Sequence, residues 1–213
     1  TAPGSHQKAF KNDVKANWRL LAHISLDDYH IVAVHPSTFG KSGYLDPDQV
    51  TYRRDGRHSV YFAGENPETI GEMADACRSG TYVPERYRTF HLFPNMILSH
   101  THVFSLAGGS IWYSIFLYYI PTAAGRTDLH VVFQPSPFSI KGTGIRRFGH
   151  DTLEWLRSLI VGYYTRRVIA EDNETCERLQ TNAPIFKTDP LLAAQEERIA
   201  WFEDAYRKQL SRS

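Results

Sequence analysis

The chain has 213 residues, of which 42% are hydrophobic and 22% charged, and its formal net charge is +1. This composition is typical of one globular domain with a sizeable core and excludes a disordered chain, while the scattered Lys and Arg residues form no basic cluster for nucleic acid. The longest apolar run, at residues 110–121, falls short of the roughly 18–20 residues that span a membrane, and its β-branched and aromatic residues predict a buried strand.

The cysteine content limits the possible chemistry. Cys77 and Cys176 are the two cysteines of the chain, and we expect free thiols in a cytoplasmic protein rather than a disulfide. Two cysteines cannot build a four-cysteine zinc site or ligate an iron–sulfur cluster by themselves. No signal-peptide pattern opens the chain, which agrees with the expected cytoplasmic location.

The N-terminal part of the sequence predicts a helix that leads into a histidine-containing stretch. Residues 1–16 are small and polar, and we expect a linker or a cloning remnant there, with the domain beginning at Asn17. From Asn17 the apolar residues recur at helical spacing into the stretch DDYHIVAVHP at 27–36. Pro36 then begins a long loop of the kind that often covers a site.

The middle of the chain predicts an antiparallel sheet. Alternation predicts a strand over 58–64, and start and stop signals predict a short helix over 66–80. Three further strand-like runs, at 95–108, 110–121 and 127–137, are separated by short turn sequences. We therefore expect these three runs to form an antiparallel meander.

Two helices are expected at the end of the chain. The first runs from about 151 to 180, and the second over 191–210 has acidic residues early and basic residues late, as the helix dipole favours. The apolar residues expected on one side of the first helix are Leu153, Leu156, Leu159, Ile160 and Tyr164. The predicted class is α+β, an antiparallel sheet flanked by helices.

Two histidines five residues apart, His30 and His35, stand among apolar residues of the stretch at 27–36. On a continuous α-helix this spacing places the two side chains about 140° apart, so they converge only if the helix ends or distorts between them, which Pro36 favours. Asp27 would share a face with His30 and could accept a hydrogen bond from its second ring nitrogen, as around metal-bound histidines. The spacing alone leaves open a metal site and a histidine at a helix end beside solvated acids.

Four segments resemble Rieske-type non-haem iron oxygenases in order and spacing. NWRLLAHISLDDYHIVAVHP at 17–36 is similar to the iron-site segment of that family, which reads N-W-K and then D/E-x-x-H-x4-H. FHLFPNMILS at 90–99 resembles the family's F-P-N entry to its central sheet, and VIAEDNETCERLQ at 168–180 resembles its late helix. DPLLAAQEERIAWFEDAYRKQL at 189–210 resembles its closing helix, so the resemblance covers nearly the whole chain from Asn17.

The resemblance implies a fold and a metal. The domain at 17–213 would have a helix-grip (Bet v 1/START-like) α+β fold and would bind one Fe(II) ion through His30, His35 and Asp172. Two imidazoles and one carboxylate form the facial set of ligands that suits ferrous iron and leaves coordination positions open. Glu171 is the rival carboxylate, and Asp172 is preferred because the family's acid falls at that position.

The resemblance also implies partners. In aromatic-ring hydroxylating oxygenases, mono- or dioxygenases of aromatic catabolism, hydroxyl groups derived from O₂ enter the substrate and electrons come from NAD(P)H through a ferredoxin and/or a reductase. Asp27 matches the acid that carries electrons from the Rieske cluster of a neighbouring subunit, which implies a homotrimer or an α3β3 assembly. The C-x-H and C-x-x-H pairs of the [2Fe–2S] Rieske cluster do not occur, so we expect the catalytic portion of a longer α-subunit, inactive alone.

Positions near the expected ligands indicate a substrate pocket. The candidates to line it are His23, Ile31, Phe39, Gly162 and Val168. His23 and the residue after it stand where relatives often carry Glu-Asn. On the strand after F-P-N, alternation places 100, 102 and 104 on one face, without fixing whether that face points inward.

Two alternatives remain open on the residues alone. A non-catalytic helix-grip module would use the same sheet and long helix to hold an apolar ligand without metal. A zinc hydrolase is disfavoured, because the histidine spacing differs from the i,i+4 pair of zincins and no general-base signature adjoins it. Iron, zinc or no metal in the purified protein would separate the three interpretations.

Overall fold

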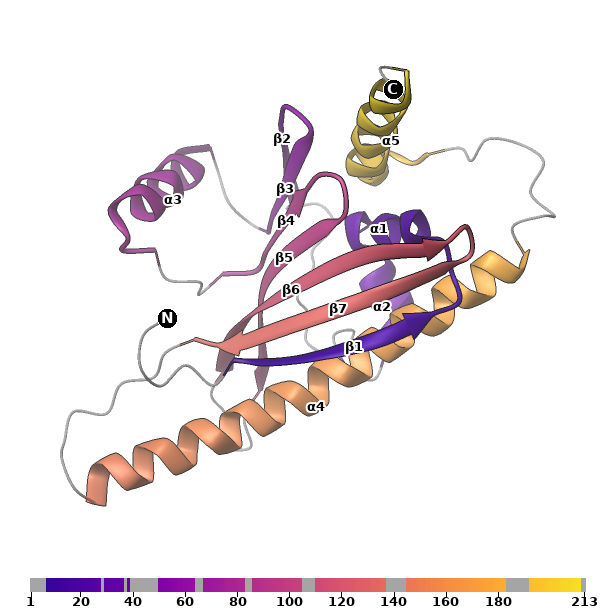
Figure 1. Ribbon diagram of the computed structural model, residues 1–213. Helices are drawn as coiled ribbons and strands as arrows, with labels where there is room; N and C mark the ends of the chain where they lie inside the picture. Colours follow the sequence, from indigo (N-terminus) through magenta and orange to yellow (C-terminus); the bar gives the residue numbers. More distant parts are fainter. Residues whose placement is uncertain are drawn as a thin grey trace.

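One antiparallel sheet organises the part of the chain that the computed structural model describes. The described residues are 7–27, 29–36, 38, 50–63, 67–82, 86–104, 110–136, 145–182 and 192–211. Within them seven strands pair in the order β1-β7-β6-β5-β4-β3-β2 (Figure 1). The strands are β1 (Lys8–Val14), β2 (Val50–Asp55), β3 (His58–Ala63), β4 (Arg88–Leu92), β5 (Met96–Phe104), β6 (Ser110–Ala123) and β7 (Arg126–Pro135). The helices are α1 (Trp18–Leu26), α2 (His30–Val34), α3 (Pro67–Ser79), α4 (Ile145–Asn182) and α5 (Glu197–Leu210), the last preceded by a 3-10 turn (Ala194–Glu196).

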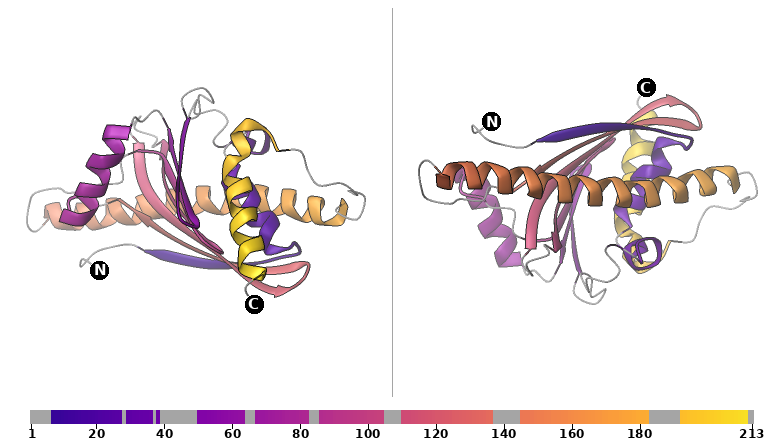
Figure 2. Two further views of the ribbon diagram at one scale, coloured as in Figure 1. Left: turned by 90° about the horizontal axis from the view of Figure 1, so that it is seen from above. Right: turned by 90° about the horizontal axis from the view of Figure 1, so that it is seen from below.

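A long helix lies across one face of the sheet. Figures 1 and 2 show α4 running the length of β1, β6 and β7, and it contacts all three strands. The short helices α1 and α2 also contact α4, and α1 packs against β5 and β6. At the other end of the sheet α5 packs against β2, β3 and α1. This α+β arrangement of an antiparallel sheet around a long helix is the helix-grip fold, as the sequence predicts.

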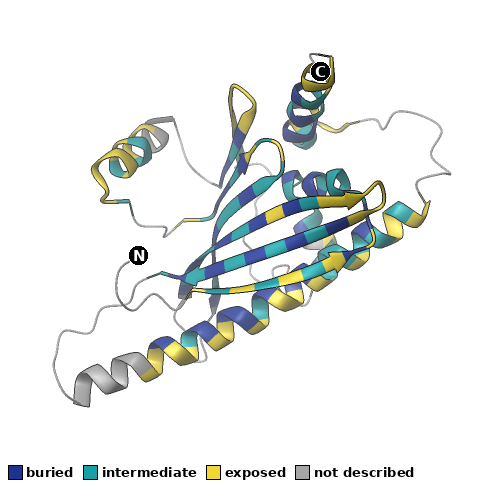
Figure 3. Cartoon of the chain, viewed as in Figure 1, coloured by how far each residue is buried: buried dark blue, intermediate teal, exposed yellow. Residues whose placement is uncertain are grey.

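The meander of β5, β6 and β7 is confirmed, and its alternation explains the core. Every second residue of β7 from Thr127 to Pro135 is buried, and β6 buries Ile111 and the four alternate residues up to Tyr119 (Figure 3). Side chains at even spacing share one face of a strand, so the two strands present one continuous apolar surface. The core forms where α1 and α4 cover this surface.

The N-terminal segment differs from the expectation. Within the segment 1–16, which was expected to be a linker, Lys8–Val14 forms β1 and pairs with β7 along its whole length. Its sequence KAFKNDV has few apolar residues, because an edge strand buries little and obtains its stability from pairing. Ion pairs add to that pairing, with Lys11 Nζ 2.6 Å from Asp128 Oδ2. Strands β2 and β4 were not predicted either, because both are short and show no clear periodicity. They lie in the half of the sheet that ends at β2, opposite the β1 edge.

The apolar side expected for the long helix is only partly buried. The helix begins at Ile145, and Leu153, Leu156 and Leu159 are 38%, 45% and 42% exposed, whereas Tyr164 is half-buried and packs against the core. Its buried positions instead include small and polar residues such as Ser158 and Thr165. The apolar spacing in the first half of α4 therefore does not mark the core.

In the described part of the chain, no helix is both long and apolar enough to cross a membrane.

Candidate metal centre

A break between two short helices brings His30 and His35 together. Asp27 ends α1 with an extended backbone (φ −94°, ψ 101°), and its Oδ1 accepts hydrogen bonds from the backbone N–H groups of Tyr29 (3.1 Å) and His30 (3.2 Å). Helix α2 then lasts five residues, and His35 follows it with non-helical dihedral angles (φ −113°, ψ 48°). The helix therefore ends as the spacing requires, and the imidazole centroids lie 5.4 Å apart.

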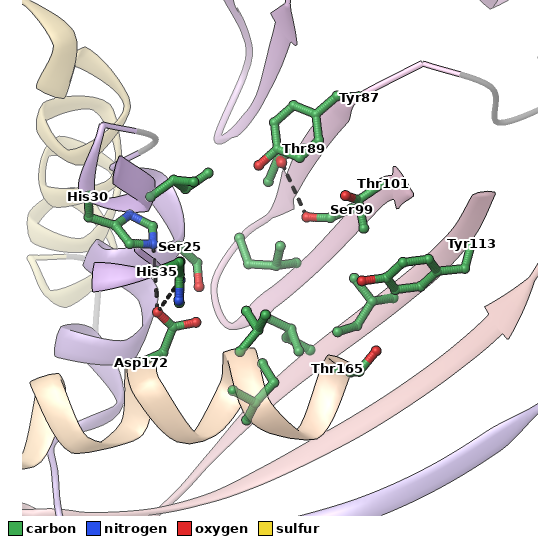
Figure 4. A pocket seen from close by; sticks show the side chains of 16 residues that line it. Ser25, His30, His35, Tyr87, Thr89, Ser99, Thr101, Tyr113, Thr165 and Asp172 are labelled. Carbon is green, nitrogen blue, oxygen red and sulfur yellow. Dashed lines mark hydrogen bonds and ion pairs between the residues drawn. The ribbon is translucent and has the colours of Figure 1, made fainter. Parts of the chain in front are cut away.

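The third member of the group comes from the long helix. Asp172 Oδ1 on α4 lies 3.0 Å from His35 Nε2 and 3.6 Å from His30 Nε2 (Figure 4). One ligand atom from each of the three residues lies within 4.8 Å of the other two. The side chains expected as metal ligands are thus brought to one point from distant parts of the chain.

Each imidazole is held through its other ring nitrogen. His30 Nδ1 bonds to the backbone carbonyl of Asp27, and His35 Nδ1 lies 2.8 Å from Glu171 Oε2, which also accepts a hydrogen bond from Thr38 Oγ1 (3.1 Å). These contacts leave both Nε2 atoms to face Asp172. The expected contact between Asp27 and His30 therefore exists, but it uses the backbone carbonyl, and the carboxylate caps α2 instead. Glu171 supports His35 from outside the group.

The surroundings shift the pKa values of the two histidines in opposite directions. Burial lowers the pKa of His30, although the charge of Asp172 acts in the opposite direction. Burial would also lower the pKa of His35, but the hydrogen bonds and charges of Asp172 and Glu171 outweigh it and raise that pKa. Metal ligation needs neutral imidazoles, so a bound cation would displace any proton held by His35.

The donor set fits a divalent metal such as ferrous iron. Asp172 Oδ1 is buried and, apart from its contact with His35 Nε2, has no hydrogen-bond partner among the described residues. A buried carboxylate oxygen without such a bond is costly unless a cation or another donor compensates it. Two imidazole nitrogens and one carboxylate oxygen on one side of a cavity form the set that non-haem Fe(II) sites use. The three residues therefore fit the metal that the sequence implies.

A cavity extends from this group between α4 and the sheet. Of the residues expected to line it, Ile31 and Val168 do so, together with apolar side chains of β5 and β6 (Figure 4). The other described apolar residues of its wall are Ile97, Ile115, Leu117 and Ile169. Phe39 lies outside the described residues.

His23 and Gly162 are not among the described residues that line the cavity. His23 faces α5, where its Nε2 lies 2.8 Å from Glu203 Oε1. Gly162 allows α4 to approach the sheet, because a Cβ atom at this position would lie 3.0 Å from Phe133 Cζ. The structure therefore pairs His23 with an acid of α5 and gives Gly162 a packing role.

The polar part of the cavity wall was missed by sequence reasoning. On β5 the residues that reach the cavity are Ile97, Ser99 and Thr101, the face opposite to positions 100, 102 and 104. His100 instead packs on the other face, where its Nδ1 lies 2.9 Å from Ser114 Oγ. Alternation predicted the two faces of this strand, but only its neighbours in the sheet decide which face meets α4.

Several solved structures share this fold. The quaternary ammonium Rieske monooxygenase CntA, in complex with an inhibitor, gives a TM-score of 0.62 at 15% identity, over 97% of this chain and 50% of that chain. Dicamba monooxygenase bound to 3,6-dichlorosalicylic acid gives 0.62 at 13% identity, over 99% and 61%. Pseudomonas putida CBB5 NdmA with caffeine gives 0.59 at 14% identity, over 96% and 52%. At these identities the likeness establishes the fold alone.

The sequence itself assigns the family. The chain spans 50% to 61% of the length of those three solved chains, and no curated protein matches its sequence. A family model described as the ring hydroxylating alpha subunit (catalytic domain) matches residues 5–212, from before β1 to beyond α5. The chain belongs to the family of ring hydroxylating alpha subunits, as a catalytic domain.

Proposed function

We propose that this chain is the catalytic domain of a terminal oxygenase that inserts hydroxyl groups derived from O₂ into an aromatic substrate. The proposed ferrous ligands are His30, His35 and Asp172. The observation that carries the proposal is the convergence of two imidazole Nε2 atoms on one buried carboxylate oxygen at the end of a cavity. A metal bound there would supply the activation of dioxygen.

The chain's own residues would prepare that site. Asp27 and Glu171 hold the two imidazoles by their Nδ1 atoms, which fixes the ring orientations before a metal arrives. The apolar wall formed by Ile31, Val168 and their neighbours would exclude water and orient a flat ring beside the ligands. Both effects favour reaction of the substrate over unproductive reduction of dioxygen.

The overall reaction requires electrons from outside this chain. Entry of one oxygen atom into a C–H bond consumes O₂, two electrons and two protons and yields one water, whereas entry of both atoms yields a diol and no water. We propose that NAD(P)H supplies the electrons through a ferredoxin and/or a reductase. A Rieske [2Fe–2S] cluster in the full-length protein, assembled as a homotrimer or with a β subunit, would deliver them across a subunit boundary at Asp27.

Iron loading and oxygen labelling test the proposal. Full-length protein, loaded anaerobically with Fe(II) and supplied with its reductase and NAD(P)H, should convert one member of an aromatic panel to a product that carries ¹⁸O from ¹⁸O₂. Metal analysis should give about one iron per catalytic domain. Tight ligand binding without iron would favour the non-catalytic helix-grip module, and zinc with hydrolysis would favour a hydrolase.

The role of Asp27 has its own test. Asn at this position keeps a side-chain oxygen for the N–H groups of Tyr29 and His30 and keeps the backbone carbonyl that bonds to His30. Asp27→Asn should therefore retain iron and the fold but stop NAD(P)H-dependent turnover in the full-length enzyme. Normal turnover by this variant would eliminate Asp27 as the electron bridge, without affecting the ligand assignment.

A further inference from the structure

We propose that the end of the cavity remote from the three ligands binds a neutral, oxygen-bearing group of the substrate, such as a ring ketone. The proposal rests on the proposed function, because it concerns the same cavity, and it names the substrate class. The substrate would be a ring compound with a hydrogen-bond acceptor at one end and the reacting carbon at the other. Neither a plain hydrocarbon nor a charged acid or amine would meet these requirements.

Two buried hydroxyl groups carry the inference. Thr101 on β5 and Thr165 on α4 are 2% and 1% exposed, and both line the cavity. Thr101 Oγ1 has no hydrogen-bond partner among the described residues, and Thr165 Oγ1 lies beside the Tyr113 phenol without a hydrogen bond of normal geometry. Figure 4 shows both threonines, with Tyr113, on the side of the cavity away from His30 and Asp172. A residue of a strand and a residue of a helix thus both place a hydroxyl group on this side of the cavity.

Other hydroxyl residues on the same elements have protein partners. On α4, Thr175 Oγ1 donates to the Glu171 carbonyl one turn earlier (3.0 Å), and Thr181 repeats this pattern. On β5, Ser99 Oγ donates to Thr89 Oγ1 (3.2 Å). A buried hydroxyl without a partner destabilises the folded protein, so its retention calls for a ligand that completes the bond.

The charge of the cavity determines what that ligand can be. Apart from the proposed metal ligands, its described lining contains no Lys, Arg, Asp, Glu or His residue. A buried carboxylate or ammonium would lack a countercharge there, which is strongly unfavourable. A threonine hydroxyl can donate a hydrogen bond to a neutral acceptor such as a carbonyl oxygen. Burial raises the pKa of Tyr113, and the neighbouring Thr165 hydroxyl only partly offsets this, so the phenol also remains a neutral donor.

The spacing along α4 indicates the size of the substrate. Thr165 and Asp172 are seven residues apart on the same face of the helix, which corresponds to about 10 Å along its axis. Between them Val168 and Ile169 contribute apolar surface to the cavity. A compound of one or two rings could therefore contact the hydroxyl groups while presenting a carbon to the metal end.

Binding of matched probes tests the proposal without turnover. Full-length protein, anaerobic and without reductant, is titrated with 1-tetralone and tetralin, with acetophenone and ethylbenzene, and with 1-naphthoate. At least one ketone should bind about tenfold or more tightly than its parent hydrocarbon, as one or two additional hydrogen bonds allow. Naphthoate should bind more weakly than that ketone.

Isosteric variants locate the effect. In a Thr101→Val, Thr165→Val double variant, the preference for the ketone should fall at least about fivefold, while the hydrocarbon binds as before. Removal of these two hydroxyls should leave the melting temperature nearly unchanged, because neither makes a hydrogen bond of normal geometry with the described residues. Thr181→Val is the control, because this hydroxyl of α4 is not among the described residues of the cavity lining and bonds to the Glu177 carbonyl, and it should keep the preference.

The proposal fails if neither ketone binds more tightly than its hydrocarbon, whether both bind or neither does. It also fails if the double variant keeps the full preference, since the hydroxyls would then serve bound water alone. A ketone preference in a protein that takes up no iron would leave the subsite standing and remove the oxygenase assignment. Iron uptake with turnover of hydrocarbons and no ketone preference would remove the subsite and leave the oxygenase assignment standing.

Discussion

Two clusters of this molecule pair imidazole with carboxylate, and they differ in what else reaches the acid. In the first, Glu203 on α5 lies 2.8 Å from His23 Nε2 and also accepts hydrogen bonds from Arg19 Nε (3.2 Å) and Nη2 (2.5 Å). In the second, Asp172 faces the Nε2 atoms of two histidines, and no guanidinium of the described residues pairs with it. The first acid has a full set of donors, whereas Asp172 Oδ1 does not.

This difference separates a structural ion pair from a candidate metal site. Burial alone would raise the pKa of Glu203, but the hydrogen bonds from His23 and Arg19 outweigh it and lower the pKa to about 2. The protein thereby compensates the charge of Glu203 internally. At Asp172 the compensation is incomplete, and a bound cation would complete it. The partners of the acid, rather than the nearness of a histidine, distinguish the two clusters.

The largest expected effect comes from removal of the acid at the second cluster. Asp172→Ala should lower the affinity for Fe(II) by more than the about 10–100-fold that loss of a supporting hydrogen bond costs, because a direct ligand is lost. Glu203→Gln is the matched control and should keep the iron. Both variants would be titrated anaerobically with Fe(II). Equal iron occupancy in both proteins would contradict the comparison.

A smaller loss of iron affinity is expected at Glu171. Glu171→Ala removes the acceptor of His35 Nδ1 and Thr38 Oγ1, so the imidazole should lose its fixed orientation and iron affinity should fall about 10–100-fold. Glu174→Ala changes an exposed acid on the same helix that pairs with Arg178 and should have no effect. Similar dissociation constants for the two variants would exclude the supporting role of Glu171.

The first cluster should affect stability rather than iron. Glu203→Gln should lower the free energy of unfolding by about 2 kcal/mol at pH 7, since charged hydrogen bonds are lost. The pKa of Glu203 is about 2 in the folded protein against an ordinary value of 4.5. Its stabilisation is therefore complete above about pH 4.5 and disappears as the pH falls towards 2. Urea unfolding at several pH values should show the variant and wild type converging in acid, and a constant difference would contradict this.

The smallest effect is expected at His23. Gln in this position can still donate to Glu203, so His23→Gln should cost about 1 kcal/mol or less in unfolding free energy. Its iron affinity should equal that of the wild type, although His23 is only seven residues from His30. A clear loss of iron affinity would show that His23 contributes to the metal site, and it would weaken the distinction between the two clusters.

The sequence predicted the elements whose local pattern is strong. Strands β5, β6 and β7 alternate over long runs, and the order of histidines and late acid matched a known arrangement. Local pattern could not predict β1, because Lys8–Val14 owes its strand to pairing with β7, 113 or more residues away in the chain. For the same reason it could not decide which face of β5 meets α4, or that Leu156 of α4 would be exposed.

The details of the site depend even more on tertiary structure. The resemblance favoured Asp172 over Glu171 as the ligand, but the local sequence could not show that Glu171 holds His35 from outside the group. Nor could it show that Thr101 and Thr165 line the same cavity, since they come from a strand and a helix. Only the packing of α4 on the sheet creates these relations.

The three ligands can be located in a crystal structure of protein loaded anaerobically with Fe(II), with anomalous diffraction measured on both sides of the iron absorption edge. One iron peak is expected within coordination distance of His30 Nε2, His35 Nε2 and a carboxylate oxygen of Asp172. An iron peak at any other position, or a fully ordered cluster of these three side chains with no iron peak beside it, would exclude this metal centre.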